Sequence, residues 1–383
     1  MHSSHPPAST TPAFGYIPAL DGLRAVAVSI VLAAHFGLHH RVPGGFGVTL
    51  FFFISGMLIT RLLLAEKAAT GRIALGRFYL RRMLRLYPAL LVAVAAGTLA
   101  TVAAGGDLRW GKVLAALFYG INYYGIAFGW SQGFNGFDPL AVLWSLAIEE
   151  QYYIVFPLAA LALAGRVRTF TGWVIAAVLA ALAWRVALVL GGAASDRIYM
   201  GTDTRIDSIL YGCLLSLLLA RPGEGGTRLL RWLSRPWLQW LALAGLLATF
   251  LLRDPFFRDS LRYTMQGLAL MPLVASLCFT DSLPRVTAWL ERGLPRRIGR
   301  LSYSLYLMHG VTITLAELVF SAASREPGAV GLLARVGFVA MVVPVTFALA
   351  AASYRWVETP FGSLRRRFGS HAVVRVAPGP AGQ

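Results

Sequence analysis

The sequence predicts an all-α integral membrane protein with about ten transmembrane helices, and two observations lead to this fold class. Of the 383 residues, 57% are hydrophobic and only 14% are charged, which is far too apolar for a soluble globular domain. Apolar runs of roughly 18 to 22 residues recur along the chain, and a helix of that length crosses a bilayer. The lipid bilayer is therefore the first expected partner.

The apolar runs define the expected spans, which are about 17–38, 45–64, 86–104, 143–164, 170–190, 206–220, 236–252, 263–280, 301–322 and 331–352. The basic segments that test this count are 61–85, 166–168, 221–235, 285–300 and 365–367. With both termini cytoplasmic, all of these segments fall on the cytoplasmic side, as the positive-inside bias requires. The sequence thus predicts a multi-pass protein of the cytoplasmic (inner) membrane. Only Arg253, Arg258 and Arg262 form a notable external group.

Segment 111–128 is apolar, but counting it as a further span would place the later arginine-rich loops outside. We expect a re-entrant or interfacial helix there, within an external segment of about 105–142. The tyrosines of this segment and Trp130 suit a membrane interface.

The ends of the chain differ from the spans in composition. Residues 1–15 are polar and proline-rich and lack the basic-then-apolar order of a cleaved signal, so we expect a disordered tail. Residues 16–361 form the expected transmembrane domain, and residues 362–383 form a basic cytoplasmic tail.

The formal net charge of +18 comes almost entirely from arginine. Membrane topology explains this excess without a nucleic-acid partner. Cys213 and Cys278 lie in apolar runs, where cysteine behaves as a small hydrophobic residue rather than as part of a disulfide or a metal site. We expect no metal site.

The first span carries three ionisable residues, Asp21, Arg24 and His35, and such groups are costly in a membrane unless they face a polar interior. Arg24 and His35 are eleven residues apart, which is within about 20° of three whole helical turns. Their side chains should share one face, roughly 16 Å apart along the axis. A neutral imidazole suits general-base work; the alternative is a histidine that only hydrogen-bonds a neighbouring helix.

The second span opens with GGFGVTLFFFISGMLIT, residues 44–60. Its small residues favour a tight turn and close helix packing. The alternative is a backbone that approaches a ligand near His35.

An arginine stripe leads into the third span. Arg77, Arg81 and Arg85 recur at four-residue intervals, with Arg82 beside them. Guanidinium groups make forked hydrogen bonds to phosphate, so the stripe would suit a polyphosphate ligand. The alternative is that these arginines only face water and lipid phosphates.

Two acids, Glu149 and Glu150, open the fourth span in WSLAIEEQYYIVFP. Adjacent carboxylates should not share one helix face, so we expect one to point inward and the other toward the interface. An inward Glu149 would orient an imidazole or bind a sugar hydroxyl. The alternative is a pair of helix-start acids that the helix dipole favours.

Further polar residues complete the candidate set. Arg205 and Asp207 lie at the outer start of the sixth span, and His309 lies mid-span in LSYSLYLMHG. Together with Glu150 they are the candidate substrate-binding residues. For Arg205 and Asp207 the alternative is an ion pair at the interface.

Short sequence elements follow one another in a fixed order from about Ile17 to Phe361. They are the DGLRA…H start, GxxGVxLFFxxSG, RRxxRxxP, SLxxEExYY, RxDxxxxG, SYSLYLxH and ETP. In order and spacing they resemble the acyltransferase-3 family of membrane-bound O-acyltransferases, which modify bacterial polysaccharides, including lipopolysaccharide and peptidoglycan, and small molecules. Longer relatives carry an appended SGNH-type hydrolase domain, and we expect none in this chain.

This resemblance implies that His35 is catalytic, that Arg24 is its required partner, and that Arg82 and Arg85 serve the acyl-donor side. The expected reaction moves an acyl group, in the first place acetyl, from acyl-coenzyme A to a hydroxyl of a carbohydrate or glycosylated small molecule. Acyl-coenzyme A is then a co-substrate, and no permanently bound cofactor is expected.

The expected mechanism places the donor's phosphates among Arg24, Arg81, Arg82 and Arg85. The pantetheine arm would follow the helix face from Arg24 to His35, which either deprotonates the acceptor hydroxyl or carries the acyl group itself. Two alternatives stand beside this enzyme: a transporter or flippase for lipid-linked sugars, and a non-enzymatic membrane sensor.

Overall fold

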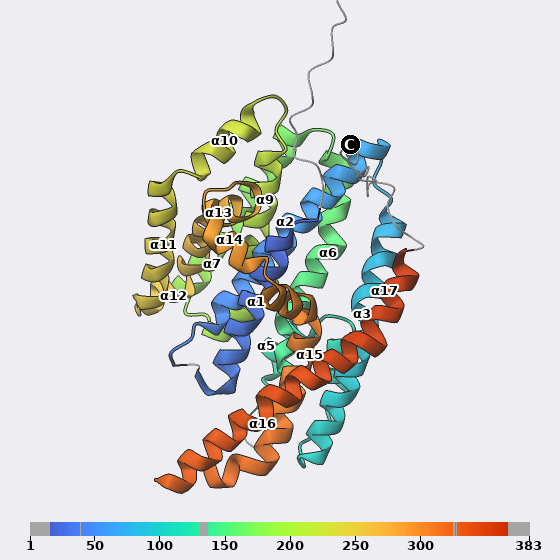
Figure 1. The fold of residues 1–383 in the computed structure, drawn as a ribbon, viewed down its shortest axis with the longest axis vertical. Helices are drawn as coiled ribbons and strands as arrows, with labels where there is room; N and C mark the ends of the chain where they lie inside the picture. The colour runs from blue at the N-terminus through green and yellow to red at the C-terminus, as the bar shows by residue number, and fades with distance from the viewer. Residues whose placement is uncertain (1–15, 39, 131–136, 325, 327, 367–383) are drawn as a thin grey trace, which may run out of the picture.

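The computed structural model describes residues 16–38, 40–130, 137–324, 326 and 328–366, and all regular structure in these ranges is helical. The long helices in Figure 1 are α1 (Pro18–Ala33, continued by the π-helical turn Ala34–Leu38), α2 (Gly44–Thr70), α3 (Leu75–Ala103), α6 (Trp144–Leu163), α7 (Val167–Leu190), α9 (Thr202–Leu219), α11 (Pro236–Leu251), α13 (Arg262–Phe279), α15 (Gly293–Ser324) and α16 (Ala329–Ser353). Each of them overlaps one predicted span.

Shorter helices connect or extend the long ones. They are α4 (Trp110–Leu117), α5 (Ile121–Phe128), α8 (Ser195–Met200), α10 (Gly225–Leu233), α12 (Pro255–Asp259), α14 (Pro284–Leu290) and α17 (Thr359–Arg366), with a 3₁₀ turn at Ala141–Leu143 and a π-helical turn at Tyr354–Glu358. Helix α17 extends into the predicted C-terminal tail. The predicted disordered tail, residues 1–15, lies outside the described residues.

Seven helices in the described ranges are long and apolar enough to cross a membrane, or eight if α13 and α14, bent by 78°, form one broken span. The prediction of an all-α, multi-pass membrane protein is confirmed. Two of the predicted spans fall short of this test. Helix α9 carries Asp203, Arg205 and Asp207 within 18 residues, and α11 has only 16 residues, which is less than the ~20 that a bilayer requires.

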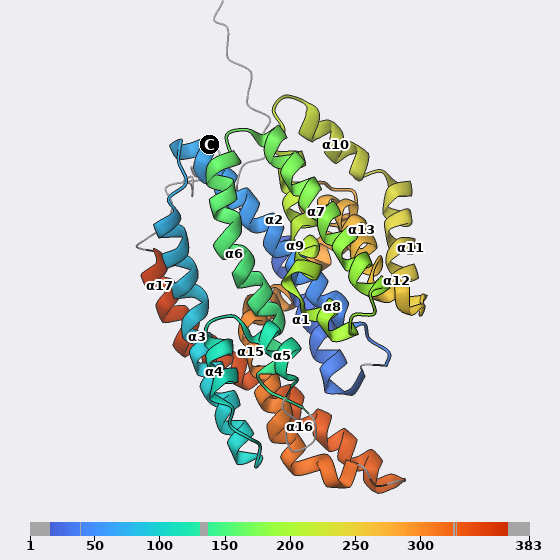
Figure 2. The ribbon, with the colours of Figure 1, turned by 180° about the vertical axis from the view of Figure 1, so that it is seen from behind.

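Segment 111–128 is not a span. It forms α4 and α5, each of eight residues, and the chain breaks between them at Tyr119, which has a φ of 55°. Figure 2 shows both helices beside α3 and α6. A buried ion pair between Lys112 Nζ and Asp138 Oδ2, 2.8 Å apart, ties α4 to the chain just before α6.

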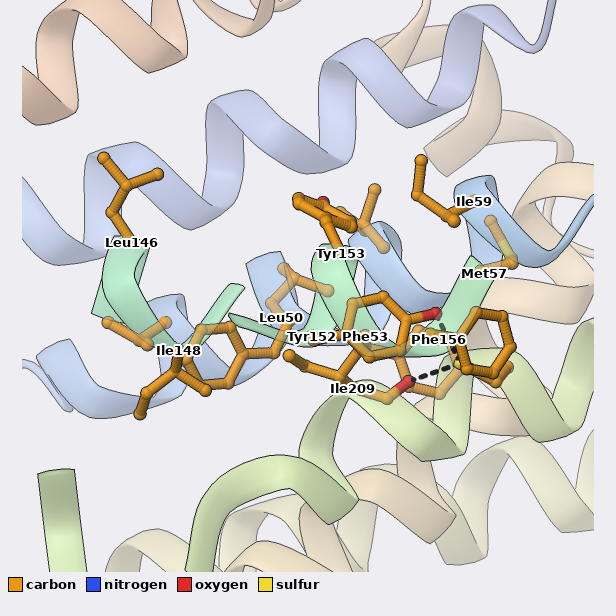
Figure 3. Packing of buried hydrophobic residues seen from close by; sticks show 14 of the residues in the cluster. Leu50, Phe53, Met57, Ile59, Leu146, Ile148, Tyr152, Tyr153, Phe156 and Ile209 are labelled. Atoms are coloured by element: carbon orange, nitrogen blue, oxygen red, sulfur yellow. Dashed lines mark hydrogen bonds between the residues drawn. The ribbon is translucent and has the colours of Figure 1, made fainter. Parts of the chain in front are cut away.

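Helix α2 forms the centre of the bundle and packs against α1 and α9. Figure 3 shows its Phe53 and Met57 in the same buried cluster as Ile209 of α9 and the aromatic residues Tyr152 and Phe156 of α6. All five side chains are buried. The core of the bundle is therefore a continuous apolar layer shared by α2, α6 and α9.

Glycines bring the backbones of α2 and α9 into direct contact. A Cβ added at Gly56 would lie 2.0 Å from Ile209 O, and one added at Gly212 would lie 1.9 Å from Phe53 O. Within α2, a Cβ at Gly47 would lie 2.6 Å from Ala27 O of α1. The small residues of segment 44–60 thus serve close helix packing.

The two ends of the bundle differ in what they carry. In Figure 1 the α2–α3 and α6–α7 connections lie at the upper end, and the α1–α2 connection lies at the lower left. We call these the upper end and the lower end. The arginine-rich start of α3 belongs to the upper end, and the π-helical turn Ala34–Leu38 leads from α1 into the α1–α2 connection at the lower end.

Candidate functional site

A cavity of about 430 Å³ lies among α1, α2, α3, α6 and α15. Four arginines line it: Arg24 from α1 and Arg81, Arg82 and Arg85 from α3. Arg77, the first residue of the predicted stripe, is exposed and does not line it. We call this space the arginine cavity. The structure thus brings together the four residues that the sequence groups as the donor-phosphate site.

Arg82 lies at the centre of the charged wall. Its Nη2 atom is 3.8 Å from Glu149 Oε1 and 3.7 Å from Glu150 Oε1, and its guanidinium lies 3.4 Å from the centroid of the Tyr153 ring. All these groups are largely enclosed, so the attraction between them is only weakly screened. Protein carboxylates therefore fix the orientation of Arg82.

Neither of the two adjacent glutamates points toward the interface, so this part of the prediction is wrong. Glu150 is buried, and both carboxylates approach the same guanidinium. Consecutive helix positions are about 100° apart, and the broad guanidinium of Arg82 spans both directions at once. Glu149 lines the cavity, whereas Glu150 is buried behind it and its Oε1 has no hydrogen-bond partner in the described chain.

Glu149 belongs to the arginine side of the site. Its Oε1 accepts hydrogen bonds from Ser55 Oγ, at 2.5 Å, and from the Tyr153 hydroxyl. With Arg82, these contacts surround the carboxylate with donors from α2, α3 and α6. The structure places Glu149 against Arg82, and that Glu149 orients the imidazole of His35 stays a prediction.

Arg81 makes a second ion pair at the upper end. Its Nη2 atom is 3.5 Å from Glu66 Oε2, and Glu66 Oε1 accepts a hydrogen bond from the backbone N–H of Ala74. This buried carboxylate links the end of α2 to the start of α3. This link fixes the position of the arginine stripe of α3 relative to α2.

Apolar side chains form most of the remaining wall. They include Phe51, Phe52, Ile54, Leu58, Ile59 and Leu62 of α2 and Phe78 and Leu86 of α3. The cavity therefore has one charged end and one apolar body.

Tyr306 of α15 and Ser145 of α6 line the cavity away from the arginine stripe. The Tyr306 hydroxyl lies 2.8 Å from Ser145 Oγ and donates a hydrogen bond to Val142 O. Tyr306 also contacts the ring of His309, with ring centroids 5.4 Å apart. The Tyr306 ring thus connects the cavity to His309.

His309 is fully buried, and its ring contacts that of His35 with centroids 5.0 Å apart. Its Nδ1 lies 2.6 Å from Tyr306 O, and since a carbonyl only accepts, Nδ1 carries the hydrogen. Nε2 of His309 is buried without a hydrogen-bond partner among the described residues.

His35 lies in the π-helical turn that ends the first span, and its side chain is exposed. Its Nδ1 lies 2.9 Å from Val31 O, so this nitrogen also carries the hydrogen and the neutral ring presents Nε2 as an acceptor. Phe137 covers another edge of the ring, with centroids 6.3 Å apart.

Arg24 lines the arginine cavity and His35 does not. The backbone between them is helical through Ala34, and non-helical angles begin only at Phe36 and at Gly37, which has a φ of 108°. That Arg24 and His35 share one helix face stays a prediction. The connection from the cavity to His35 runs through the rings of Tyr306 and His309.

Arg205 and Asp207 are fully buried, and neither lines the arginine cavity. Arg205 lies over the Tyr263 ring, 3.9 Å from its centroid, and donates to Thr49 Oγ1 at 3.2 Å. The expected alternative, an ion pair between Arg205 and Asp207, is not what the structure contains, because Asp207 Oδ2 pairs with Arg185 Nη2 at 2.9 Å.

Several residues of the site had no place in the sequence prediction. Ser55, Tyr153, Ser145 and Tyr306 belong to the quoted elements, but only the fold shows that they face the cavity. Arg185 could have been found, because it is an arginine within the apolar run of the fifth span and a charged residue there requires a partner.

Comparison with known proteins gives the same family as the sequence elements. The model of the acyltransferase-3 family, described as an acyltransferase domain, matches residues 17–355. A Staphylococcus aureus (strain COL) relative with O-acetyltransferase in its name is 32% identical over 364 residues, which cover 90% of this chain and 57% of the relative. No solved structure matches significantly.

Two further relatives have more specific names. The peptidoglycan O-acetyltransferase OatA of Listeria monocytogenes is 30% identical over 360 residues, covering 90% of this chain and 56% of the relative. The O-acetyltransferase OatA of Staphylococcus aureus (strain NCTC 8325 / PS 47) is 31% identical, covering 90% and 57%. The chain thus spans a little over half the length of these relatives. Because the family model covers most of the chain, the protein belongs to the acyltransferase-3 family.

Proposed function

We propose that this protein is a membrane-bound O-acyltransferase that moves an acyl group, in the first place acetyl, from acyl-coenzyme A to a hydroxyl of a carbohydrate or glycosylated small molecule. The observation that carries the proposal is the contact between His35 and His309, which joins a histidine with an acceptor nitrogen to an arginine-lined cavity through Tyr306. The names of the relatives favour acetyl as the acyl group.

The donor enters from the charged end of the arginine cavity. Coenzyme A carries phosphate groups, and guanidinium groups bind phosphate by forked, charge-assisted hydrogen bonds. Arg24 and Arg85, together with Arg81, provide the phosphate-binding wall, while Arg82, fixed by its two glutamates, sets the shape of that wall.

The apolar body of the cavity receives the pantetheine arm. Phe51, Ile54 and Phe78 are among the side chains that line this body, and they suit an arm that is mostly aliphatic. The thioester then has to pass Tyr306, whose ring contacts both the cavity and His309.

His35 acts at the acceptor. Its Nε2 takes the proton of the acceptor hydroxyl while the hydroxyl oxygen attacks the thioester carbonyl. The carbon–sulfur bond breaks, the ester forms, and the departing thiolate of coenzyme A takes the proton back from the imidazolium. In the covalent variant, Nε2 itself attacks the carbonyl and the carbon–sulfur bond breaks, which releases the thiolate. The acceptor hydroxyl then attacks the acyl carbon, the nitrogen–carbon bond breaks, and the hydroxyl proton passes to the thiolate.

This proposal places the protein in the cytoplasmic (inner) membrane with both termini cytoplasmic, so that the upper end, with the arginine cavity, faces the acyl-coenzyme A pool. The exposed side of His35 then faces the external half of the membrane. The bias of the arginine-rich connections toward one side supports this orientation.

The test compares cells that contain the wild-type chain with cells that contain His35→Ala. Mass spectrometry of membrane glycans and secreted glycosylated compounds should show an acyl gain with the wild-type chain and none with the variant. Binding of coenzyme A to the purified variant is the control for folding. Equal acylation at equal protein levels would contradict the proposal, and movement of an unmodified sugar across the membrane would favour the flippase instead.

A further inference from the structure

A second cavity, of about 410 Å³, lies away from the arginine cavity, between the α1–α2 connection and the ends of α8, α11 and α13. Its wall contains four arginines: Arg41 from the connection, Arg253 and Arg258 beside and within α12, and Arg262 at the start of α13. We call it the lower cavity. None of these residues belongs to the acyl-transfer site described above.

The charge of the lower cavity is strongly unbalanced. Asp196 is the one carboxylate among the described residues that line it, against the four arginines. Two nearby acids are already engaged: Asp254 Oδ1 caps α12 by accepting from Phe257 N, and Asp259 Oδ2 accepts from Ser195 Oγ at 2.6 Å. The excess of positive charge therefore faces the cavity.

Arg262 provides the buried part of this wall. Its Nη2 donates to the Tyr263 hydroxyl at 2.8 Å, and its guanidinium lies 4.9 Å from the centroid of the Tyr263 ring. Its Nε is buried and has no hydrogen-bond partner in the described chain. An enclosed guanidinium nitrogen without an acceptor is costly, and an oxyanion in the cavity would remove that cost.

Neutral donors stand beside the arginines. Tyr199 of α8 lines the cavity, and burial raises the pKa of Tyr199 above its usual range, so that its hydroxyl keeps its hydrogen. Its hydroxyl oxygen lies 3.0 Å from the position of a Cβ added at Gly45, so α8 meets the start of α2 there. The wall of the cavity therefore contains a neutral donor as well as the charged ones.

The lower cavity is also close in sequence to the catalytic candidate. Residues 40–46 form one wall, and they directly follow the π-helical turn that carries His35. A Cβ at Gly44 would lie 2.7 Å from the Cβ of Ala34, the residue before His35. A ligand held here lies against the segment that positions His35.

We propose that the lower cavity is a binding site for a phosphate-type oxyanion. Arginine is the residue best suited to such a group, because its planar fork matches two oxygens at once. The distribution of arginines between the connections also predicts that this end is external. Arginine is otherwise scarce on that side, so membrane topology does not explain the group formed by Arg253, Arg258 and Arg262.

The role of the site rests on the proposed function, although the binding itself does not. If His35 acylates a hydroxyl, an anion in the lower cavity anchors an acidic acceptor beside it. The same oxyanion chemistry has two sources, a soluble phosphorylated compound and the headgroup of an anionic lipid, and the experiment has an arm for each.

The experiment measures binding of inorganic pyrophosphate to the full chain in phosphatidylcholine nanodiscs by calorimetry. Because the arginine cavity also suits phosphates, all proteins carry Arg24→Gln and Arg85→Gln. Adding Arg253→Gln and Arg258→Gln should raise the Kd at least about tenfold, the effect of losing one charge-assisted hydrogen bond. Adding Arg253→Lys and Arg258→Lys should cost less, since the charge remains.

Arg109→Gln is the matched control. Arg109 is exposed and lies on the same predicted external side, but it does not line the cavity, so its substitution should leave the Kd unchanged. Equal Kd values for the variant with Arg253→Gln and Arg258→Gln and for this control would overturn the proposal. The proposal also fails if the reference protein, which carries only Arg24→Gln and Arg85→Gln, does not bind pyrophosphate.

The second arm repeats the titration in nanodiscs that contain phosphatidylglycerol. Loss of pyrophosphate binding there assigns the site to a lipid headgroup, and unchanged binding assigns it to a soluble phosphorylated ligand; either result supports an oxyanion site. If His35→Ala leaves acylation intact while pyrophosphate still binds, the proposed function fails and the oxyanion site stands.

Discussion

His35 and His309 lie edge to face, with ring centroids 5.0 Å apart and an angle of 68° between their planes. In each ring Nδ1 meets a main-chain carbonyl, that of Val31 for His35 and that of Tyr306 for His309. When either ring is neutral, its hydrogen therefore lies on Nδ1 and Nε2 is the acceptor. The exposed ring of His35 can receive a substrate proton, while the buried ring of His309 fixes its position.

This pair predicts that His309→Phe reduces turnover without weakening donor binding. Phenylalanine fills the space but loses the hydrogen bond to Tyr306 O, so the ring loses its fixed orientation against His35. We expect kcat to fall about 100-fold, the usual cost of a misplaced reacting group, with an unchanged KM for acetyl-coenzyme A. His309→Asn, whose amide can still donate, should recover part of the loss. A rise in KM at constant kcat would instead indicate that His309 binds substrate.

The sequence predicts the members of this site better than their arrangement. His35, His309 and the arginines are visible because charged or ionisable residues in apolar runs require a reason. Periodicity assigns Arg24 and His35 to one face, but it does not predict that His35 meets the ring of His309 from α15. No pattern within the first span contains that information, because the contact depends on how α1 and α15 pack.

The arginine cavity predicts a difference between two positions of one stripe. Arg85 lines the cavity, whereas Arg77 is exposed two turns earlier on α3 and lies outside it. Arg85→Gln should raise the Kd for coenzyme A roughly tenfold to 100-fold, because it removes one charge-assisted hydrogen bond. Arg77→Gln should change it little. Titration of both purified variants measures this difference, and equal effects would mean that the stripe acts only through its general charge.

Loss of Arg82 should lower the stability of the protein, and neutralising its two glutamate partners should restore it. Arg82→Ala leaves Glu149 and Glu150 enclosed without their cation, and breaking a buried pair in this way costs about 3–5 kcal/mol of unfolding free energy. Adding Glu149→Gln and Glu150→Gln should restore much of that loss, because neutral amides need no counter-charge. Thermal unfolding of the three proteins in detergent measures the recovery. An equally low stability of the triple variant would show that the Tyr153 contact, rather than charge, makes Arg82 essential.

The environment of Arg82 also shows where sequence reasoning ends. Helical geometry predicts that Glu149 and Glu150 diverge, and along α6 they do point in different directions. A guanidinium from α3 reaches both because α3 and α6 approach the same side of the cavity. The meeting of one arginine with two glutamates of another helix depends on how the helices pack. Residue spacing within a single helix does not predict it.

The contact between α2 and α9 predicts that Gly56→Ala is strongly destabilising. Its Cβ would lie 2.0 Å from Ile209 O, a backbone atom that cannot rotate away, so the two helices would have to separate. We expect a loss of about 1–3 kcal/mol, as in other overpacked cores. Gly172→Ala in α7 is the matched control, because nothing lies within 4 Å of its Cβ position. Comparable unfolding temperatures for the two variants would contradict the close contact.

Substitution of Asp207 distinguishes a structural role from the substrate-binding role that the sequence predicts for this residue. It is fully buried, pairs with Arg185 at 2.9 Å, and lines neither cavity. Arg185 of α7 also donates to Thr204 O of α9 and to Thr264 Oγ1 of α13, so its guanidinium links α7, α9 and α13. Asp207→Asn leaves this guanidinium without its counter-charge and should lower the free energy of unfolding by about 3–5 kcal/mol.

The activity measurement decides between the two roles of Asp207. In the structural role, the folded fraction of Asp207→Asn keeps the wild-type KM for the acceptor. The double variant Arg185→Met with Asp207→Leu should regain stability relative to Asp207→Asn, because no charge remains buried. If Asp207→Asn instead raises KM while the unfolding temperature stays constant, the carboxylate binds substrate, and a path from the acyl-transfer site to α9 must open in the working enzyme.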